Sequence, residues 1–333
     1  MKKDFDYSVF ICRCQPFHNG HKELFNEALC QGETVLIVLG SYKKAPDIAN
    51  PWSAEQREQM IRLALTPEEL EHTRFLYVRD AWYNNNKWLT EVQQLVYEAT
   101  DGCDDEKICN IGAINDFPQW KFFFQKNIDH MPHATAIREL YFTHDVAYKK
   151  HVHPKVTQWL ETFKTTDAFK YLKSSFDYIR DYKSAWEGAP FPVSFVTVDA
   201  LVVKSGHVLV VRRKGALGKG QLALPGGFLN QDETIQAGAL RELKEETAIK
   251  VDRAILSSCI KDTKVFDFPH RSLRGRVISH AFLIDLGNGQ LPKVKGEDDA
   301  DRAWWMSLSE LVTREEDFFE DHYQIISHFV NKF

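Results

Sequence analysis

Residues 227–249 read GFLNQDETIQAGALRELKEETAI, and this stretch decides the fold of the second half of the chain. It opens with a Pro-Gly-Gly turn at residues 225–227. Ile235, Ala239 and Leu243 then recur at the spacing that places apolar side chains on one face of a helix. The pattern predicts an amphipathic helix that is entered from a glycine turn.

Three glutamates lie close together on this predicted helix. Glu242, Glu245 and Glu246 are at positions i, i+3 and i+4, so their side chains emerge within one turn of each other. Like charges at this spacing repel unless something neutralises them. A hard divalent cation does so, since Mg²⁺ binds a few carboxylates together with water and substrate phosphate. The cluster indicates metal-assisted chemistry on a phosphate ester, and the alternative is a solvated helix face.

Fixed spacing connects the cluster to residues further upstream. Gly227 is followed after five residues by Glu233, and after seven more by the run Arg241-Glu242-Leu243-Lys244-Glu245-Glu246-Thr247. This pattern resembles the Nudix box of nucleoside diphosphate hydrolases. The resemblance implies a C-terminal α+β domain of the α/β/α sandwich type. It also implies that the three clustered glutamates are catalytic and bind Mg²⁺, with Mn²⁺ as the alternative.

The same resemblance implies substrate contacts and a substrate. The expected substrate-binding region includes Gly226, Gly227 and Arg241. Within it, Arg241 is expected to orient Glu233 rather than to touch the substrate. The PGGFL form of the turn favours ADP-ribose, cut to AMP and ribose 5-phosphate. The family usually has glycine where this chain has Ala248. Glycine there ends the helix in a left-handed conformation that alanine disfavours by about 1 kcal/mol, so a different helix end is expected.

An acidic run, GEDDAD, occupies residues 296–301. Many Nudix enzymes place a general base in this region to activate water, and the resemblance makes Glu297 a catalytic candidate. The alternative is a solvated acidic loop.

Length and composition set the class of protein. With 333 residues the chain is too long for one ordinary core, which predicts two domains. Hydrophobic residues make up 44% and charged residues 27%, a soluble globular balance. The net charge of −5 gives no overall attraction to nucleic acid or to an anionic membrane. The longest apolar runs, such as residues 35–39, have the length of strands and cannot span a bilayer.

The chain start and the cysteines predict a cytoplasmic protein. Arg13 comes too early for the apolar core of a signal peptide. The six cysteines form no CxxC pair and no metal-like grouping, which fits free thiols in a reducing cytoplasm. Cys12 and Cys14 alternate along a predicted strand and are interpreted as packing residues.

The first half begins with a βαβ pattern. Residues 8–12 form a short apolar run, a helix opens at His18-Asn19-Gly20-His21, and a second strand is predicted at residues 34–39. In such a unit the turn lies at the carboxyl edge of a parallel sheet, where ligands bind. His18 and His21 stand beside a helix N-terminus that favours phosphate, and Gly20 leaves room for it to approach the backbone.

Four stretches of the first half share one resemblance. They are RCQPFHNGH at residues 13–21, GSY at 40–42, NPWSAEQR at 50–57 and HATAIR at 133–138. Together they resemble the HxGH nucleotidyltransferases, and among these the archaeal-type nicotinamide mononucleotide adenylyltransferases. The resemblance implies an N-terminal Rossmann-like domain with a parallel sheet. The family tends to have glycine in place of Cys12 and serine in place of His133.

The resemblance also assigns roles in adenylyl transfer. His18, His21 and Arg138 are the implied catalytic residues, which hold the triphosphate of ATP together with Arg13 while Mg²⁺ bridges its oxygens. Further substrate contacts are expected from Gln15, Gly20, Ser41 and Thr135. If the mononucleotide phosphate attacks the α-phosphorus of ATP directly, no protein nucleophile is needed. Catalysis then consists of positioning and charge stabilisation.

Aromatic and amide side chains alternate in DAWYNNNKW, residues 80–88. This mixture suits a flat ring that carries a carboxamide. In the resembled family the loop receives nicotinamide mononucleotide (NMN), so Trp88 is expected to stack and Asn84 to make a polar contact, with NAD and pyrophosphate as products. The alternative is a solvent loop with two structural tryptophans. Asn115-Asp116, after a predicted strand at residues 107–112, is also expected near the site.

The predicted domains are a nucleotidyltransferase domain at residues 1–186 and a Nudix hydrolase domain at residues 193–333. A linker at residues 187–192, stiffened by two prolines, joins them. Helices are predicted over residues 154–186, with a break at Thr166-Asp167. In the second domain we expect strands at residues 193–203, 208–213, 255–260, 277–286 and 303–306. Helices are expected there at residues 309–311 and 318–333.

The main hypothesis is a fused enzyme that makes NAD in its first domain and hydrolyses ADP-ribose in its second. In one alternative the first domain adenylylates another acceptor, such as a flavin or pantetheine phosphate. In another, the Nudix half senses a ligand and regulates the transferase without turning that ligand over. No nucleic acid and no membrane is expected as a partner. The sequence does not reveal the oligomeric state, and a homo-oligomer is left open.

Overall fold

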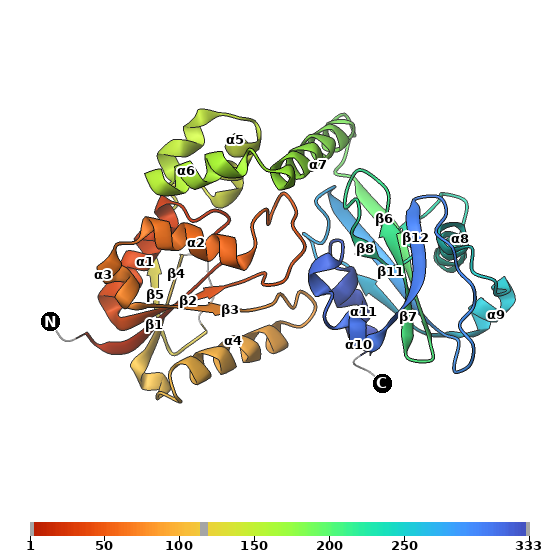
Figure 1. Ribbon diagram of the computed structural model, residues 1–333, viewed down its shortest axis with the longest axis horizontal. Coiled ribbons are helices and arrows are strands. Elements are labelled where there is room, and N and C mark those ends of the chain that lie inside the picture. The colour runs from red at the N-terminus through yellow and green to blue at the C-terminus, as the bar shows by residue number, and fades with distance from the viewer. Residues whose placement is uncertain (1–2, 114–118, 331–333) are drawn as a thin grey trace. The chain divides into compact units, whose positions relative to one another are not determined.

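The computed structural model describes residues 3–113 and 119–330, and the chain divides into two compact units, Met1–Lys173 and Ser174–Phe333 (Figure 1). The division falls within helix α7 (Asp167–Ser184), whereas the predicted domain limit lies at residue 186. The domain limits stay a prediction. Asn115-Asp116 lies outside the described residues. Every helix in the described part of the chain is too short or too polar to cross a membrane.

The first unit is an α/β structure. Its elements before α7 are β1 (Phe5–Cys12), α1 (Asn19–Gln31), β2 (Gly32–Leu39), α2 (Ala54–Ala64), α3 (Pro67–Glu71), β3 (Thr73–Tyr77), α4 (Asn85–Ala99), η1 (Asp105–Lys107), β4 (Ile108–Ala113), β5 (Phe122–Lys126), α5 (Ala134–Phe142), η2 (Val146–His151) and α6 (Pro154–Phe163). Among the described residues the strands form one parallel sheet in the order β3-β2-β1-β4-β5. The predicted Rossmann-like parallel sheet is confirmed.

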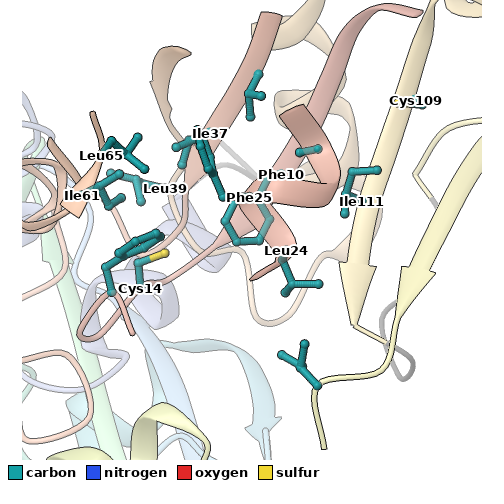
Figure 2. Close-up of a cluster of buried hydrophobic side chains, with 14 of the residues drawn as sticks. Phe10, Cys14, Leu24, Phe25, Ile37, Leu39, Ile61, Leu65, Cys109 and Ile111 are labelled. Atoms are coloured by element: carbon teal, nitrogen blue, oxygen red, sulfur yellow. The ribbon is translucent and has the colours of Figure 1, made fainter. Parts of the chain in front are cut away.

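Helices cover both faces of this sheet. Along β1, Phe10 packs with Phe25 of α1 and with Ile37 of β2, as Figure 2 shows. The preceding residue, Val9, points to the opposite face and packs with Val92 of α4. This alternation is the period of two that a strand imposes on its side chains. Because β1 and β2 are parallel and joined through α1, their carboxyl ends and the start of α1 lie at one edge of the sheet.

The second unit is an α/β/α sandwich. Its elements are β6 (Ser194–Lys204), β7 (His207–Arg213), β8 (Leu222–Ala223), β9 (Gly226–Phe228), α8 (Ile235–Thr247), α9 (Arg253–Ser258), β10 (Ile260–Phe266), β11 (Arg276–Asp285), β12 (Ala300–Ser307), α10 (Leu308–Leu311), η3 (Glu315–Asp317) and α11 (His322–Val330). In the described residues the sheet order is β10-β11-β6-β7-β12, with β8 beside β7 and β9 beside β6. Strands β6 and β11 are parallel, and the other pairs are antiparallel.

Helix α8 supplies part of the core of this unit. Its Ala239 and Leu243 pack with Val198 and Ala200 of β6, so the predicted apolar stripe faces the sheet. On α11, Phe329 contacts Phe266 of β10 with ring centroids 6.0 Å apart. Figure 1 shows α8 and α11 on opposite sides of the sheet, which completes the sandwich.

Three local predictions for the second unit and the cysteines need correction. The Pro-Gly-Gly turn is not a turn throughout, because Gly226–Phe228 forms β9 and pairs with β6. The strand expected at residues 255–260 is instead helix α9, which buries Leu256 and exposes Ile255, and the strand β10 begins only at Ile260. A short apolar run fits either structure by pattern alone.

The free-thiol prediction is wrong for two cysteines. Cys12 and Cys14 form a disulfide with their Cα atoms 5.4 Å apart. Two positions along a regular strand separate Cα atoms by about 6.6 Å. Here β1 ends at Cys12 and Cys14 takes a left-handed backbone with φ 50°, which brings the two residues closer. The free cysteines are Cys30, Cys103, Cys109 and Cys259.

Candidate functional site

In the first unit the predicted histidines meet at the start of α1. His18 is the N-cap residue, and its Nδ1 accepts a hydrogen bond from the Gly20 amide at 3.1 Å. The rings of His18 and His21 are 3.8 Å apart. A ring carbon of His18 would lie 2.9 Å from a Cβ at position 20, so glycine is needed there to admit the His18 ring. The structure thus gives a packing reason for Gly20, and its predicted role of leaving room for phosphate stays a prediction.

The environment keeps both imidazoles neutral. Burial is the main cause that lowers the pKa of His18 to about 4, and electrostatic interactions with His133, His151 and Arg138 add to the lowering. Burial and the neighbouring His18 hold the pKa of His21 well below its usual value, against a backbone hydrogen bond at Pro16. Because Nδ1 of His18 is an acceptor, the proton of its neutral ring is on Nε2. That N–H is the group with which His18 can donate to a phosphate oxygen.

The predicted phosphate ligand Arg138 is buried and already bonded. Its guanidinium donates to the carbonyl of Gln15 at 2.6 Å, to the carbonyl of Ile48 at 3.1 Å and to Oγ1 of Thr135 at 3.1 Å. Burial lowers its pKa to about 10. The side-chain amide of Gln15 is paired at both ends with the backbone of Trp52. In this structure Arg138 therefore ties together three segments around the His18 loop.

A further arginine, Arg57, holds the carboxyl edge of the sheet and was missed by sequence reasoning. It is fully buried, and its Nη1 donates to the carbonyls of Arg13 at 2.7 Å and Gly40 at 2.8 Å. Arg13 itself is exposed, so its side chain is free of the packing that fixes its carbonyl. The only sequence signal for this role was the position of Arg57 at the end of the motif at residues 50–57.

The loop predicted to receive the mononucleotide is built partly from structural contacts. The hydroxyl of Ser41 donates to Asp80 at 2.8 Å, which connects the end of β2 to this loop. Asn84 is the N-cap of α4, where its Oδ1 accepts from the amide of Lys87 at 3.0 Å. Trp88 is half-buried and packs on the core face that Val92 also lines. The ligand-binding roles of Asn84 and Trp88 stay predictions.

In the second unit Arg241 lies at the centre of the Nudix residues. It binds Glu233 through Nε at 3.0 Å and Nη2 at 2.6 Å, while its Nη1 donates to Glu242 and to Glu245, both at 2.8 Å. These hydrogen bonds lower the pKa of Glu233 to about 2. The protein itself thus supplies a positive charge to two of the three clustered glutamates.

The two glycines of the box lie directly against the other acidic groups. The Gly226 amide donates to Oε2 of Glu246 at 3.0 Å. A Cβ at Gly227 would stand 2.6 Å from Oε1 of Glu242, so that carboxylate occupies the space a side chain would fill. Strand β9 therefore meets α8 through the carboxylates of Glu242 and Glu246.

Both of these carboxylates are destabilised as anions. Burial raises the pKa of Glu246 to about 8, the Gly226 amide opposes this, and the charges of Glu242 and Asp299 add to it. Burial also raises the pKa of Glu242, against Arg241, with Glu245 and Asp298 adding to the rise. A buried carboxylate, Glu246, beside a partly buried one, Glu242, favours either a proton or a cation between them.

The predicted general base Glu297 lies on the rim of this site. Its side chain is 49% exposed and pairs with Lys295 at 3.4 Å, while its amide donates to the Glu246 carbonyl at 3.1 Å. Its neighbours Asp298 and Asp299 are the residues whose charges act on the clustered glutamates. Sequence reasoning singled out the run but not these two members.

The left-handed end of α8 forms without glycine. Ala248 has φ 45° and ψ 30°, and its amide donates to the carbonyl of Lys244 at 2.9 Å. The expectation of a different helix end is wrong. The chain adopts the left-handed conformation that glycine favours, although this conformation is less favourable for alanine.

Comparison with known proteins agrees with this division. The cytidylyltransferase-like family matches residues 9–167, and the NUDIX domain family matches residues 193–329. Over 181 residues the chain is 32% identical to the nicotinamide/nicotinic acid mononucleotide adenylyltransferase of Acinetobacter baylyi, covering 52% of this chain and 94% of that protein. Over 118 residues it is 38% identical to the ADP-ribose pyrophosphatase of Methanocaldococcus jannaschii, covering 35% and 63%.

A solved structure matches nearly the whole length. The bifunctional NMN adenylyltransferase/ADP-ribose pyrophosphatase of Francisella tularensis, complexed with AMP and a manganese ion, is 37% identical. The match has a TM-score of 0.93 and covers 98% of this chain and 99% of that one. The chain belongs to the bifunctional NMN adenylyltransferase/ADP-ribose pyrophosphatase family. Both resemblances drawn from the sequence, to HxGH adenylyltransferases and to Nudix hydrolases, are thereby confirmed.

Nudix enzymes use a divalent metal, and the residues of this family member fit one. Within the described residues no three acidic, histidine or cysteine side chains are already gathered as metal ligands. The reason is visible in the contacts, since Arg241 draws Glu242 and Glu245 toward itself. Glu242, partly buried, and Glu246, buried, nevertheless form a pair of hard oxygen donors with raised pKa values, and a divalent cation stabilises such a pair.

Proposed function

We propose that this chain is a bifunctional enzyme of NAD metabolism. Its first unit transfers AMP from ATP to nicotinamide mononucleotide, giving NAD and pyrophosphate. Its second unit hydrolyses ADP-ribose to AMP and ribose 5-phosphate. The observation that carries the proposal is that one chain holds two arrangements suited to phosphate chemistry. They are the close imidazole pair at the start of α1 and the Gly226–Glu246 contact beside Arg241.

In the first unit the residues act by positioning and hydrogen bonding. The mononucleotide phosphate attacks the α-phosphorus of ATP, and the bond to the pyrophosphate leaving group breaks. His18 donates its Nε2 proton in a hydrogen bond to the triphosphate, and the dipole at the N-terminus of α1 favours the negative phosphate. Because His18 is neutral near pH 7, it contributes a donor rather than a positive charge. Exposed Arg13 supplies charge, while Arg138 holds the Gln15 and Thr135 contacts in place.

In the second unit Glu242, Glu245 and Glu246 are the proposed metal-binding residues. Mg²⁺ is the proposed ion, with Mn²⁺ as the alternative, and the bound ion would neutralise charge on the pyrophosphate oxygens of ADP-ribose. Arg241 keeps Glu233 and Glu242 in place, and the Gly226 amide orients Glu246. Glu297, on an exposed rim, remains the proposed general base.

The test uses the full chain and two assays on each preparation. One assay offers ATP with nicotinamide mononucleotide, nicotinic acid mononucleotide, a flavin mononucleotide or pantetheine phosphate. The other offers ADP-ribose and other nucleoside diphosphate derivatives with Mg²⁺, with Mn²⁺, or with a chelator. We expect a clear preference for nicotinamide mononucleotide and for ADP-ribose, and loss of hydrolysis with the chelator. Equal rates across either panel would remove the corresponding substrate assignment.

Variants of the full chain distinguish hydrolysis from sensing. The double change Glu245→Gln and Glu246→Gln is expected to abolish ADP-ribose turnover while adenylyl transfer persists. Glu310→Gln, a change to an exposed glutamate of the same unit that pairs with Arg314, serves as the matched control and leaves both activities intact. Unchanged turnover in the double variant would favour the sensor alternative. A cytoplasmic location, the absence of nucleic-acid partners and a homo-oligomer stay predictions.

A further inference from the structure

The C-terminal segment at residues 318–322 lies against the chain that leads into β9. The Phe319 amide donates to the carbonyl of Leu222 at 2.8 Å, and Leu222 and Phe318 form a β-bridge. Two residues further along, the Leu224 amide donates to Nδ1 of His322 at 3.1 Å. Both Leu224 and His322 are buried. A side chain at the start of α11 therefore satisfies a backbone donor two residues before Gly226.

Buried ion pairs fix this segment from its other side. Asp321 binds Arg271 through two hydrogen bonds of 2.7 and 2.9 Å, with both side chains almost completely buried. The neighbouring Glu320 accepts from the hydroxyl of Ser272 at 2.6 Å. A bidentate arginine–carboxylate pair gives geometric specificity, since two parallel bonds define the orientation of both groups. The position of His322 is thus set by its neighbours and not by its own ring alone.

The segment that His322 contacts leads into the backbone that binds the clustered glutamates. The carbonyl of Pro225 accepts from the Ala200 amide at 2.8 Å, and the next amide, that of Gly226, donates to Glu246 at 3.0 Å. On the opposite side, a Cβ at Gly226 would lie 2.5 Å from Oδ1 of Asp199, and that oxygen is 3.8 Å from Nδ1 of His322. His322, Asp199 and Glu246 thus surround one short piece of backbone.

We propose that His322 is a positioning residue for ADP-ribose hydrolysis, because its ring holds the Leu224 amide and thereby places the Gly226 amide that orients Glu246. The inference rests on the proposed function of the second unit. His322 touches neither the clustered glutamates nor any group proposed to bind the substrate. It acts through the backbone from Leu224 to Gly226. Removal of its acceptor leaves a buried N–H without a partner, which is unfavourable unless the segment moves.

The protonation state of His322 suits this role. Burial lowers its pKa to about 3, the charge of Asp321 opposes this, and nearby arginines add to it. The neutral ring can accept at Nδ1, whereas a protonated ring could only donate and would repel the Leu224 amide. Arg271 neutralises the charge of Asp321 in an ion pair, so the imidazole of His322 remains neutral beside this buried carboxylate.

The test compares four variants of the full chain. His322→Leu removes the acceptor, and His322→Asn keeps an acceptor at the δ position. His322→Gln keeps the amide but moves it one methylene further out. His328→Leu is the matched control, because it makes the same change on the same helix at a site that contacts Lys264 instead. For each variant we measure kcat and KM for ADP-ribose, the Mg²⁺ concentration at half-maximal rate, adenylyl transfer and the unfolding midpoint.

We expect His322→Leu to lower kcat about 10- to 100-fold, with KM for ADP-ribose little changed and a higher Mg²⁺ requirement, as for other groups that orient metal ligands. His322→Asn should recover most of the rate, and adenylyl transfer should stay intact in both. A wild-type kcat in folded His322→Leu would overturn the inference. If that variant does not fold, equal rates in the Asn and Gln variants would overturn it. Absence of ADP-ribose turnover in the wild-type chain would instead refute the proposed function.

Discussion

Replacing Gly227 with alanine tests whether the position of Glu242 governs hydrolysis. The added Cβ would lie 2.6 Å from Oε1 and 2.7 Å from Cδ of Glu242. Ordinary contact begins near 3.4 Å, so the carboxylate must retreat by about 0.8 Å. Because this carboxylate is the end of a flexible side chain, the fold absorbs the shift at little cost. Misplacement on the order of 1 Å in a catalytic arrangement costs about 100-fold in rate.

The neighbouring glycine provides the contrasting case. A Cβ at Gly226 would stand 2.3 Å from the carbonyl oxygen of Val198 and 2.5 Å from Oδ1 of Asp199. Val198 belongs to the central strand β6, and its paired backbone cannot shift in the way that the end of a flexible side chain can. We therefore expect Gly226→Ala to destabilise the second unit by about 1–3 kcal/mol or more, as overpacked interiors do.

The assay measures kcat for ADP-ribose with saturating metal and urea unfolding on the same samples. Gly215→Ala is the control, since its new methyl group would meet nothing within 4 Å. Gly227→Ala should be nearly as stable as the wild type but about 100-fold slower, whereas Gly226→Ala should lose stability. A folded Gly227→Ala enzyme with wild-type kcat would refute the reasoning, as would a Gly226→Ala enzyme of unchanged stability.

Three further predictions concern stability. Ala248→Gly should stabilise the second unit by about 1 kcal/mol, measured by urea unfolding, because the left-handed backbone at this position suits glycine; a loss of stability would contradict this. Asp321→Asn should cost about 3–5 kcal/mol in the same assay by leaving the Arg271 charge unpaired in the interior, and a surface-like cost below 1 kcal/mol would disprove it. The pKa of His18 is lower in the folded than in the unfolded protein, so its neutral form contributes fully to stability above pH 6.5. As the pH falls toward 4, the free energy of unfolding of the first unit decreases by about 3 kcal/mol. His18→Asn should remove that part of the pH dependence in unfolding midpoints measured between pH 7 and 4, and identical curves would reject it.

Local pattern was enough to predict several elements. The apolar stripe of α8 repeats within one helix, so Leu243 could be placed on the core face without knowledge of the sheet. The β1–α1–β2 unit was also readable, because strand and helix periods alternate over a short span and the connection restricts the pairing to parallel. The hairpin between β6 and β7 turns at Ser205 and Gly206, both with positive φ, and Gly206 is the residue type that suits this backbone.

Other features depend on contacts that no local pattern contains. β9 is a strand only because β6 offers it hydrogen bonds, and its glycines alone indicate a turn. α9 stands where a strand was expected, and it packs Leu256 into the core, a contact that the short apolar run does not contain. The Cys12–Cys14 disulfide required the left-handed backbone after the end of β1, which the alternation of the strand concealed.

The amino-acid sequence by itself determined which chemical groups this protein has and at what intervals along each helix, because those depend only on residue type and helical period. It placed His18 beside His21, and Glu242 beside Glu246, without any knowledge of distant segments. Tertiary structure alone decided their charge and their partners. Leu224 and His322 are 98 positions apart in the sequence, yet the Leu224 amide donates a hydrogen bond to the His322 ring. Burial, which lowers the pKa of His18 to about 4 and raises that of Glu246 to about 8, is created by packing of the whole unit around them.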